Sequence, residues 1–523
     1  MKKITFWQTI RNLAVYSLLT VVVVPVIWVA GISDAEAVPA FARKYDMTCN
    51  VCHTRQPRLN PFGQRFLENG YQLPGTADGG TKEKHLLGGE LNGVTLDDIS
   101  NYMAVRLRAD IQQASFVDNK IIGDVSDDPD IVFPNVVNIF FAGTATEDIS
   151  FFFETEYATQ GAEEPALRFE RSYLSFNNLG GQQVATVKVG NFDPSAMYSF
   201  PTHRQTINPV PAAASTDGFP PEVYRAPLLP LAFSSKMFGL TRGPSKSSDE
   251  LRTGVSPAGN TTYDPEGDDG YSILPFEPMF YNAPAQKGIS IHGRPFGNSL
   301  LYQVGVVQAE TAEDVSKTTF DPYIMLRYDI LGSNSNLQFS GFYYTASKAA
   351  RAALRPPVAP FNGEVVFARE ASDWVRMGVG ARWQYKSLDI YGTYITDEID
   401  KPDFGNPVLN MSVWETDASG LSIEADWLLT RKWLLGVRYD MMRSGGLSKL
   451  PPGLQAGDPE INQDASFIAF IGKYYPTPSI GLYGRYHMNL EDSVKLPAAG
   501  FGGVENPATN LESMITVGVD MAF

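Results

Sequence analysis

The sequence predicts an all-β protein: a transmembrane antiparallel β-barrel of about sixteen strands, preceded by a small, mostly helical N-terminal segment. Three observations support this fold class. Runs with period-two alternation of apolar and polar residues recur about sixteen times. The connections between them alternate between short and long, as in outer-membrane barrels. After residue 37 no run of 18 apolar residues occurs, so a helical membrane protein is not expected.

The chain begins with an export signal over residues 1–37. Positive charges in the first eleven residues precede an apolar run at 13–30 and the triplet Ala35-Glu36-Ala37, which is typical of a cleavage site. The alternative is a retained membrane anchor, but Pro25 inside the run and the triplet after it favour cleavage. We therefore expect a mature chain outside the inner membrane.

A five-residue motif, Cys49-Asn50-Val51-Cys52-His53, follows closely. The spacing C-x-x-C-H is that of c-type haem attachment. Cys49 and Cys52 would form thioethers with the two haem vinyl groups, and His53 would be an axial ligand of the iron. The motif therefore predicts one covalent haem c, with the distal ligand unknown and no catalytic residue beyond the haem.

The motif has two other possible interpretations. A zinc site needs further clustered ligands, but Cys49 and Cys52 are the only cysteines and the other four histidines are scattered. A dithiol oxidoreductase would place the motif at a strand-to-helix turn near a βαβ pattern, and none is visible. Both are weaker than haem attachment.

Residues 38–95 form the candidate haem segment. Asn60 can cap a short helix that has Pro61 in its first position. Phe62 and Phe66 then lie one turn apart, and Gly70 suits a left-handed helix end. The aromatic face is either a small core or a cover for haem. A segment this small could hardly bury haem alone, so we expect it to lean on the barrel or to plug it.

Residues 96–523 are assigned to the barrel. In the last strand Ile515, Val517 and Val519 alternate with Thr516, Gly518 and Asp520, and the chain ends on Phe523. Residues 102–113 alternate equally clearly, whereas the pattern over 167–177 is weaker. The remaining runs lie near 136–145, 149–159, 182–192, 286–296, 299–310, 321–330, 336–347, 372–386, 388–398, 418–430, 432–443, 464–475 and 478–490.

Long polar connections separate pairs of strands that are joined by tight turns. Short turns of this kind face the periplasm in bacterial barrels, and long loops face outward. The connection at 193–285 is too long for an ordinary loop and is rich in proline. We expect part of it to fold into the lumen, although an external loop is the alternative.

Charge narrows the possible partners. The formal net charge is −16, which argues against nucleic-acid binding. Acidic groups gather at 124–130 and at 264–269. Oxygen ligands of this kind can hold Fe(II) transiently, but acidic loops are more often only solvated surface. Outer-membrane lipid is the one partner that the barrel itself requires.

The N-terminal motifs resemble those of the fused outer-membrane monohaem cytochrome c–porin family of iron-oxidising bacteria. The resemblance covers residues 39–74: Pro39 to Arg43, the haem motif, Pro57-x-Leu59-Asn60-x-Phe62-Gly63, then Phe66 and Asn69-Gly70-Tyr71. It implies a haem held by Cys49, Cys52 and His53 on the periplasmic side of a barrel or within its lumen.

The same resemblance implies a function. Members of the family are Fe(II)-oxidising outer-membrane cytochromes that take electrons from extracellular Fe(II) and pass them to a periplasmic c-type cytochrome or similar acceptor. Two alternatives stay open: a solute-transporting porin that carries a haem, and a conduit for a different extracellular donor or acceptor. Possible distal haem ligands are His85, Met103, Met197 and His203. Met47 lies too close to the first thiol to reach the distal face, His292 and His487 fall within predicted strands, and a five-coordinate haem stays open.

Overall fold

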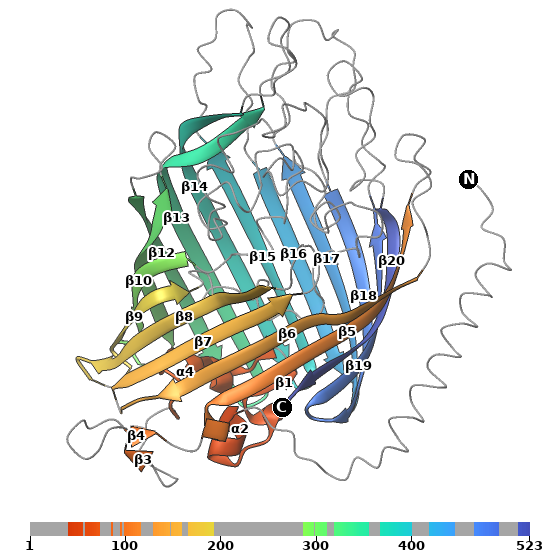
Figure 1. Cartoon of the computed structure of the whole chain (residues 1–523), viewed down its shortest axis with the longest axis horizontal. Coiled ribbons are helices and arrows are strands. Elements are labelled where there is room, and N and C mark those ends of the chain that lie inside the picture. The colour runs from red at the N-terminus through yellow and green to blue at the C-terminus, as the bar shows by residue number, and fades with distance from the viewer. Residues whose placement is uncertain are drawn as a thin grey trace, which may run out of the picture.

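The computed structural model describes most of the predicted barrel and part of the haem segment (Figure 1). The described residues are 40–55, 58–73, 85–86, 95–96, 99–116, 129–146, 148–158, 166–181, 183–192, 286–297, 299–310, 318–354, 367–399, 418–444, 465–490 and 511–523. The export signal, the 193–285 connection and most of the two acidic stretches lie outside these residues. No helix among the described residues is long and apolar enough to cross a membrane.

Sixteen antiparallel strands form one closed barrel, and each strand pairs with its neighbours in sequence. The last strand closes the sheet by pairing with the first, from Leu511 opposite Phe116 to Ala522 opposite Arg106. All sixteen predicted strands are confirmed. Their bounds are β5 Met103–Phe116, β6 Asp130–Thr144, β7 Ile149–Ala158, β8 Ala166–Leu179, β9 Ala185–Phe192, β10 Gln286–Gly293, β11 Leu300–Glu310, β12 Thr318–Leu331, β13 Ser335–Leu354, β14 Phe367–Tyr385, β15 Leu388–Ile399, β16 Ala418–Leu428, β17 Trp433–Ser444, β18 Ala465–Thr477, β19 Ile480–Asn489 and β20 Leu511–Ala522.

The two faces of the barrel differ as the alternation predicts. Outward side chains are apolar or aromatic, such as Ile423 and Trp427 on β16. Their inward neighbours Glu424 and Asp426 are fully buried. Because a bilayer cannot solvate polar groups, an apolar outer face and a charged inner face are the arrangement that a spanning barrel requires.

β-bulges explain where the sequence pattern is weak. In the pairing of β7 with β8, the register shifts between Phe169 and Arg171, so Glu170 has no partner residue on β7. This bulge moves the apolar positions that follow it to the other face of the strand. A second slip in β6 falls around Pro134, opposite Ala109 of β5. Proline lacks the amide hydrogen that a regular ladder needs, so an irregular position suits it.

The short turns gather at one rim, where the C-terminus also lies (Figure 1). Tight connections join β6 to β7, β8 to β9, β10 to β11, β12 to β13, β14 to β15, β16 to β17 and β18 to β19. Outward aromatic residues border this rim, including Trp433, whose ring centroid lies 4.7 Å from that of Tyr474. Aromatic girdles mark a membrane interface, and the short-turn rim is the periplasmic one.

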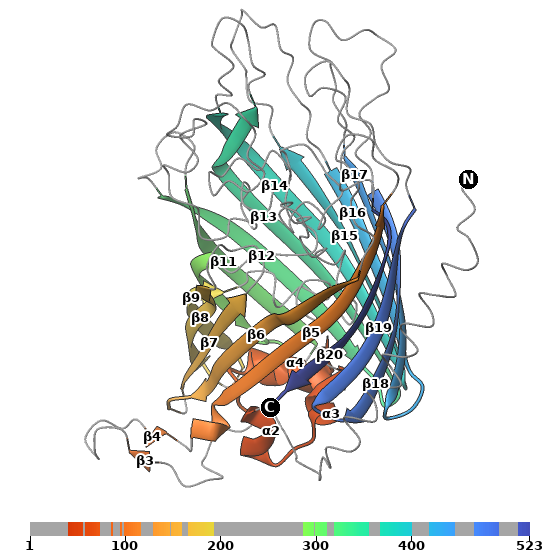
Figure 2. The same cartoon turned by 45° about the vertical axis from the view of Figure 1, so that its right-hand side comes forward.

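The N-terminal segment lies at the same rim, inside and below the barrel mouth (Figure 2). It contains the helices α2 (Ala40–Tyr45), α3 (Cys49–Cys52) and α4 (Pro61–Glu68) and the short strands β1 (His53–Arg55) and β2 (Arg58–Leu59). Two further short strands, β3 (His85–Leu86) and β4 (Thr95–Leu96), and the 3-10 helix η2 (Ile99–Asn101) lead to β5. We call residues 40–55 and 58–73 the plug.

Helix α4 forms as its sequence predicts. The Asn60 side chain accepts a hydrogen bond from the Gly63 amide at 2.9 Å, and Pro61 occupies the first helical position. The helix ends before Gly70, whose φ of 66° is the left-handed conformation that glycine adopts easily. A Cβ at Gly70 would overlap the side chain of Asn177 on β8, so the helix end packs tightly against the wall.

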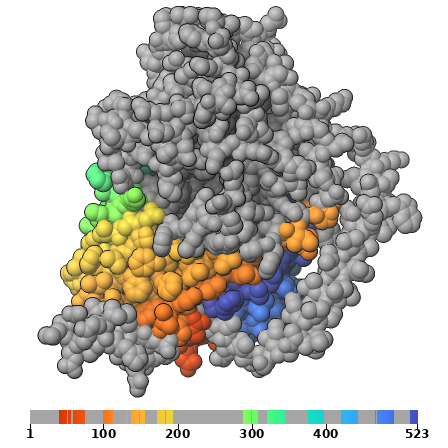
Figure 3. Space-filling model, in the orientation of Figure 1, coloured from red at the N-terminus to blue at the C-terminus, as the bar shows by residue number. Residues whose placement is uncertain are grey.

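The outer surface of the first strands is continuous. In the space-filling view, β5 to β8 form an unbroken band across the lower half of the molecule (Figure 3). Their inward side chains are therefore accessible only from inside the barrel, which is where the plug meets them.

Candidate functional site

The C-x-x-C-H motif folds as one helical turn followed by a strand. Cys49 and Cys52 begin and end α3, so both thiols lie on one side of a single turn. His53 leaves the helix in an extended conformation (φ −118°, ψ 132°), and its backbone N–H donates to the Cys49 carbonyl. The two cysteines are not joined by a disulfide. The three predicted haem-binding residues are thus brought to one place.

Asn60 ties this turn to α4. Its backbone N–H donates to the Cys52 carbonyl at 2.9 Å, and its side-chain Nδ2 donates to the Val51 carbonyl at 2.8 Å. Gly63 completes the contact, because any Cβ at this position would overlap the Cys52 carbonyl oxygen. One asparagine and one glycine therefore fix the motif on the first turn of α4.

The following hairpin binds the barrel wall through Arg58. Strand β1 pairs with β2, with His53 opposite Leu59. The Arg58 guanidinium then contacts three carboxylates of β15 and β16, at 3.1 Å for Asp389, 2.5 Å for Glu424 and 2.7 Å for Asp426. Burial disfavours the charged guanidinium, but these carboxylates outweigh it and raise the pKa of Arg58.

Further polar contacts hold the same hairpin. Arg382 of β14 donates to the Leu59 carbonyl at 2.8 Å and contacts Asp389 at 2.8 Å. Thr54, the residue after His53, donates to Asp389 at 3.3 Å. Asp389 thereby links the wall to both strands of the hairpin that carries the imidazole.

A second ion-pair cluster holds the end of α4. Glu68 contacts Arg294 of β10 at 2.8 Å and also Arg327 of β12. Both arginines contact Asp329 as well, at 2.6 Å and 3.0 Å. Burial opposes ionisation of Glu68, but the positive charges of Arg327 and Arg294 and their hydrogen bonds to the carboxylate outweigh it and lower the pKa of Glu68 to about 2. Glu68 is therefore ionised at neutral pH.

Aromatic rings attach the plug to a third part of the wall. The hydroxyls of Tyr71 and Tyr173 are 2.5 Å apart. The Tyr71 ring stacks between Phe41 of α2 and Phe152 of β7, with centroid distances of 5.1 and 5.7 Å. The predicted aromatic face of α4 is present in part: Phe66 is buried against Phe41 at 5.0 Å.

The plug is thus held on three sides of the barrel, by β7 and β8, by β10 and β12, and by β14 to β16. The wall residues involved lie close to the short turns, so the plug occupies the short-turn mouth of the barrel (Figure 2). Sequence reasoning did not identify Arg58 or Glu68 as important. In the sequence each is only a single charged residue, close to the haem motif for Arg58 and at the end of the predicted helix for Glu68. Their partners in the wall lie more than 200 positions away along the chain.

The residues present fit a covalently attached haem. Both thiols and the imidazole are only partly buried, and Val51 between the cysteines is 36% exposed, so this turn is not sealed against the wall. Burial and the neighbouring Cys49 raise the pKa of Cys52 to about 11.

A zinc site is disfavoured. Within the part of the chain that the structure describes, no group of three or more His, Cys, Asp or Glu side chains could hold a metal ion. Two thiols and one imidazole are too few for a closed structural zinc site, whereas they are the full set that a c-type haem takes from C-x-x-C-H.

The distal-ligand candidates that the structure describes lie on different elements. His292 uses Nε2 for a 2.9 Å hydrogen bond with the Glu68 carbonyl, so it contributes to holding α4. His487 is buried in the lumen wall on β19. His85 lies in β3, Met47 follows α2 and Met103 begins β5. Met197 and His203 are outside the described residues.

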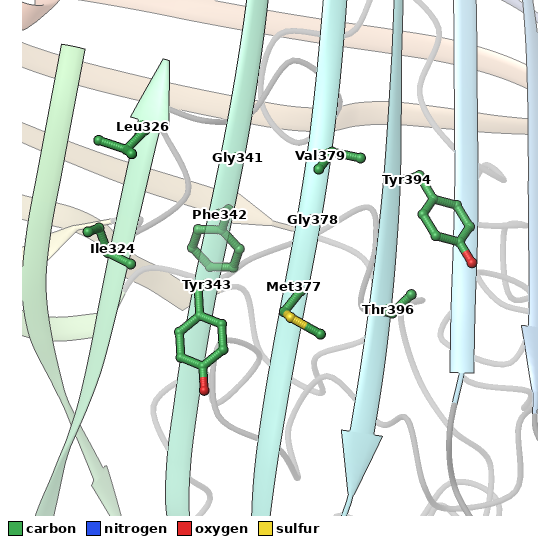
Figure 4. Close-up of a pocket in the computed structure, with 10 residues that line it drawn as sticks. All are labelled: Ile324, Leu326, Gly341, Phe342, Tyr343, Met377, Gly378, Val379, Tyr394 and Thr396. Atoms are coloured by element: carbon green, nitrogen blue, oxygen red, sulfur yellow. The ribbon is translucent and has the colours of Figure 1, made fainter. Parts of the chain in front are cut away.

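A shallow groove of about 400 Å³ lies on the outer surface across β12 to β15. Figure 4 shows Tyr343, Met377 and Val379 beside Gly341, which has no side chain to fill the space. The groove belongs to the lipid-facing surface, and few polar groups converge on it. It is a place for acyl chains and lacks the polar groups of a reaction site.

Comparisons with known proteins concern the barrel. No family model and no curated protein matches the sequence. The chain is similar to a solved anion-selective porin from Comamonas acidovorans (TM-score 0.44, 13% identity, 80% of this chain and 98% of that one). It is also similar to OmpT of Vibrio cholerae (0.41, 12%, 84% and 100%) and to the outer membrane channel DcaP of Acinetobacter baumannii (0.43, 10%, 80% and 96%).

The barrel geometry defines the class of protein. A closed sheet of sixteen strands with an apolar outer face, a charged lumen and an aromatic border at the short-turn rim is a porin-like β-barrel of the bacterial outer membrane. What distinguishes it from an open porin is the plug that lies in its short-turn mouth.

Proposed function

We propose that this protein is an outer-membrane electron conduit of the fused cytochrome c–porin type. In this proposal it oxidises extracellular Fe(II) by means of one haem c attached at Cys49 and Cys52, with His53 as axial ligand. Each Fe(II) becomes Fe(III) and gives up one electron, and a periplasmic c-type cytochrome or similar acceptor gains it.

One observation carries the proposal: a C-x-x-C-H turn is fixed in the short-turn mouth of a closed sixteen-strand barrel. An electron crosses a bilayer poorly without a carrier. A redox group enclosed by the barrel could accept an electron from one side of the membrane and pass it to the other. Extracellular oxidation is also chemically sensible, since ferric products at neutral pH are insoluble.

The chain's own residues have distinct parts in this proposal. Cys49 and Cys52 would hold the cofactor, and His53 would supply an imidazole nitrogen to its iron. A c-type haem supplies a one-electron couple whose potential depends on the axial ligands and the surroundings. Arg58, Asp389 and Arg382 keep the His53 hairpin at the wall, while the outer face of the barrel excludes water.

Solute transport is the second candidate function, because the barrel is of the porin type. The plug argues against it, since residues of α4 and β2 contact the wall on several sides of the mouth. A conduit for another donor would use the same site, so only the donor would differ.

The decisive measurement is anaerobic stopped-flow spectroscopy of the purified, oxidised protein mixed with Fe(II). We expect rapid growth of reduced haem bands. His53→Ala should lose this response while still folding as a barrel, and Lys432→Ala, in an exposed turn of the same rim, should keep it.

Two results would contradict the proposal at different levels. A haem that dithionite reduces but Fe(II) leaves oxidised would remove iron as the donor. A purified protein without a c-type haem spectrum, expressed with its maturation machinery, would remove the redox function altogether.

A further inference from the structure

Three buried side chains on the lumen face of β19 and β20 have polar atoms without hydrogen-bond partners in the part of the chain that the structure describes. The atoms are Nε and Nη2 of Arg485, Nε2 of His487 and Oγ1 of Thr516. The exposed fractions of the three side chains are 5%, 3% and 0%. Leaving a buried charged donor unpaired is costly, so such a cluster calls for a ligand.

The strand register brings these three residues to one patch of the lumen face. Arg485 lies directly opposite Thr516, and opposite residues in an antiparallel pair have Cβ atoms about 5 Å apart. His487 is two residues further along β19 on the same face, at roughly 7 Å. All three side chains alternate with outward neighbours such as Tyr486 and Ile515, so they face the lumen.

The two unpaired nitrogens of Arg485 are chemically specific. Nε–H and Nη2–H run side by side along one edge of the guanidinium, a fork that matches two oxygens of a carboxylate or phosphate. The carbon at the centre of that guanidinium lies 4.9 Å from the ring centroid of Tyr483. The aromatic contact restrains the group, and among the described residues its other edge has no hydrogen-bond partner.

The surrounding charges favour an anion. Asp520 contacts Arg106 at 2.9 Å and Lys473 at 3.6 Å, and Asp110 contacts Arg108 at 3.3 Å. With Arg485 added, these contacts define a cluster of four cations and two carboxylates. In the Glu68 cluster, by contrast, two arginines balance two carboxylates. The surplus of positive charge is local, in a chain whose net charge is −16.

We propose that Arg485, Thr516 and His487 form an oxyanion-binding site in the lumen wall. The fork of Arg485 donates to two oxygens of a carboxylate or phosphate group, and the Thr516 hydroxyl donates to one of them. His487 adds a third donor when Nε2 carries a proton. The oxyanion is either a free anion that enters the lumen or a propionate of the haem in the proposed function.

The test uses the full-length protein purified with its haem, and inorganic phosphate as the probe. Phosphate binding is measured by titration calorimetry at constant ionic strength for wild type, Arg485→Gln, Arg485→Lys and Thr516→Val. Arg431→Gln removes one positive charge from an exposed turn and is the matched control. Barrel folding is checked by heat-modifiable gel migration.

A free-anion site predicts that wild type binds phosphate and that Arg485→Gln weakens binding by about tenfold or more, the loss expected for a charged hydrogen bond. Arg485→Lys should be intermediate, because the charge stays and the fork is lost. Arg431→Gln should match wild type. Thr516→Val conserves volume and removes the hydroxyl donor, so we expect several-fold weaker phosphate binding. This variant tests the site independently if an arginine variant does not fold.

A propionate at the site predicts a different result. The haem-loaded protein would then not bind phosphate, and the propionate bending band in the resonance Raman spectrum would shift in Arg485→Gln and Thr516→Val. The inference is overturned if wild type binds no phosphate and this band is the same in all variants. If the protein carries no haem, the phosphate titration alone decides, so the two proposals fail separately.

Discussion

At the scale of single residues, two charged side chains attach the plug to the wall. Arg58 is 2% exposed and contacts three carboxylates, while Glu68 contacts two arginines. Neither belongs to the haem motif. A buried ion pair adds little net stability over an apolar pair, but removing one partner leaves the other charge buried and uncompensated.

Replacement of Arg58 by methionine is expected to release the plug. Asp389, Glu424 and Asp426 would lose their shared cation, at a cost of about 3–5 kcal/mol. Limited proteolysis should then cut within the plug while the strands stay protected. Lys432→Met, an exposed change at the same rim, is the control. Equal protection of the plug in both variants would contradict this role for Arg58.

Glu68 makes plug docking dependent on pH. Its pKa is lowered to about 2 in the folded protein, below the ordinary value of 4.5. A lowered carboxylate pKa gives stability that is complete above the unfolded value and is lost as pH falls through the folded value. We therefore expect plug protection to be constant above about pH 5 and to decline towards pH 2, as followed by hydrogen exchange.

The matched variant for this titration is Glu68→Gln, which keeps the shape but cannot ionise. It should have weaker protection at neutral pH than wild type and a smaller change between pH 5 and pH 2. An identical acid profile in the two proteins would show that other carboxylates control docking.

At the scale of elements, the contact between α3 and α4 decides how the haem motif is presented. The helix cap at Asn60 and the close approach at Gly63 bring a turn and a helix together without any long side chain between them. Capping residues of this kind contribute about 1 kcal/mol. Here the capping residue, Asn60, also donates hydrogen bonds to the backbone carbonyls of Val51 and Cys52 and so holds the turn with the two cysteines.

Gly63→Ala is expected to separate the two elements. The new methyl group would overlap the Cys52 carbonyl, which is backbone and cannot move aside alone. Gly484→Ala is a suitable control, because a Cβ there has no atom within 4 Å. The covalent haem content per barrel, measured by pyridine haemochrome absorbance, should fall in Gly63→Ala and stay normal in the control.

At the scale of the whole molecule, the barrel and the plug have separate determinants. Each strand is hydrogen-bonded to the strands next to it in sequence, and the last strand, β20, is hydrogen-bonded to the first, β5. The barrel is therefore built from consecutive antiparallel pairs and one closing pair. The plug contributes no strand to the barrel sheet. Its described contacts with the wall are mostly with inward side chains, and Arg43 also donates to the backbone carbonyl of Met103 in β5. The barrel is therefore expected to close without it.

Deletion of residues 40–73 behind an intact export signal tests this separation. We expect a barrel that still inserts and shows a several-fold larger conductance in planar bilayers than wild type, because the periplasmic mouth is unblocked. Unchanged conductance would mean that the plug does not limit the pore, and it would favour solute transport as the function.

The sequence by itself determined the barrel. All sixteen strands, their faces, the tight turns and the cap and end of α4 follow from local patterns, since alternation has a period of two and capping acts within one turn. It also identified Cys49, Cys52 and His53 as one motif. The weak pattern over 167–177 needed the structure, because a bulge shifts the alternation in a way that composition does not reveal.

Only the tertiary structure decided which wall residues meet the plug. Arg58 is 366 positions from Glu424, and Glu68 is 226 from Arg294. The unpaired edge of Arg485 and the charge surplus around it likewise arise only when β5 closes against β20. Such pairings depend on barrel closure and on which inward side chains of different strands lie at the same height along the barrel axis. No local stretch of the sequence determines either of these.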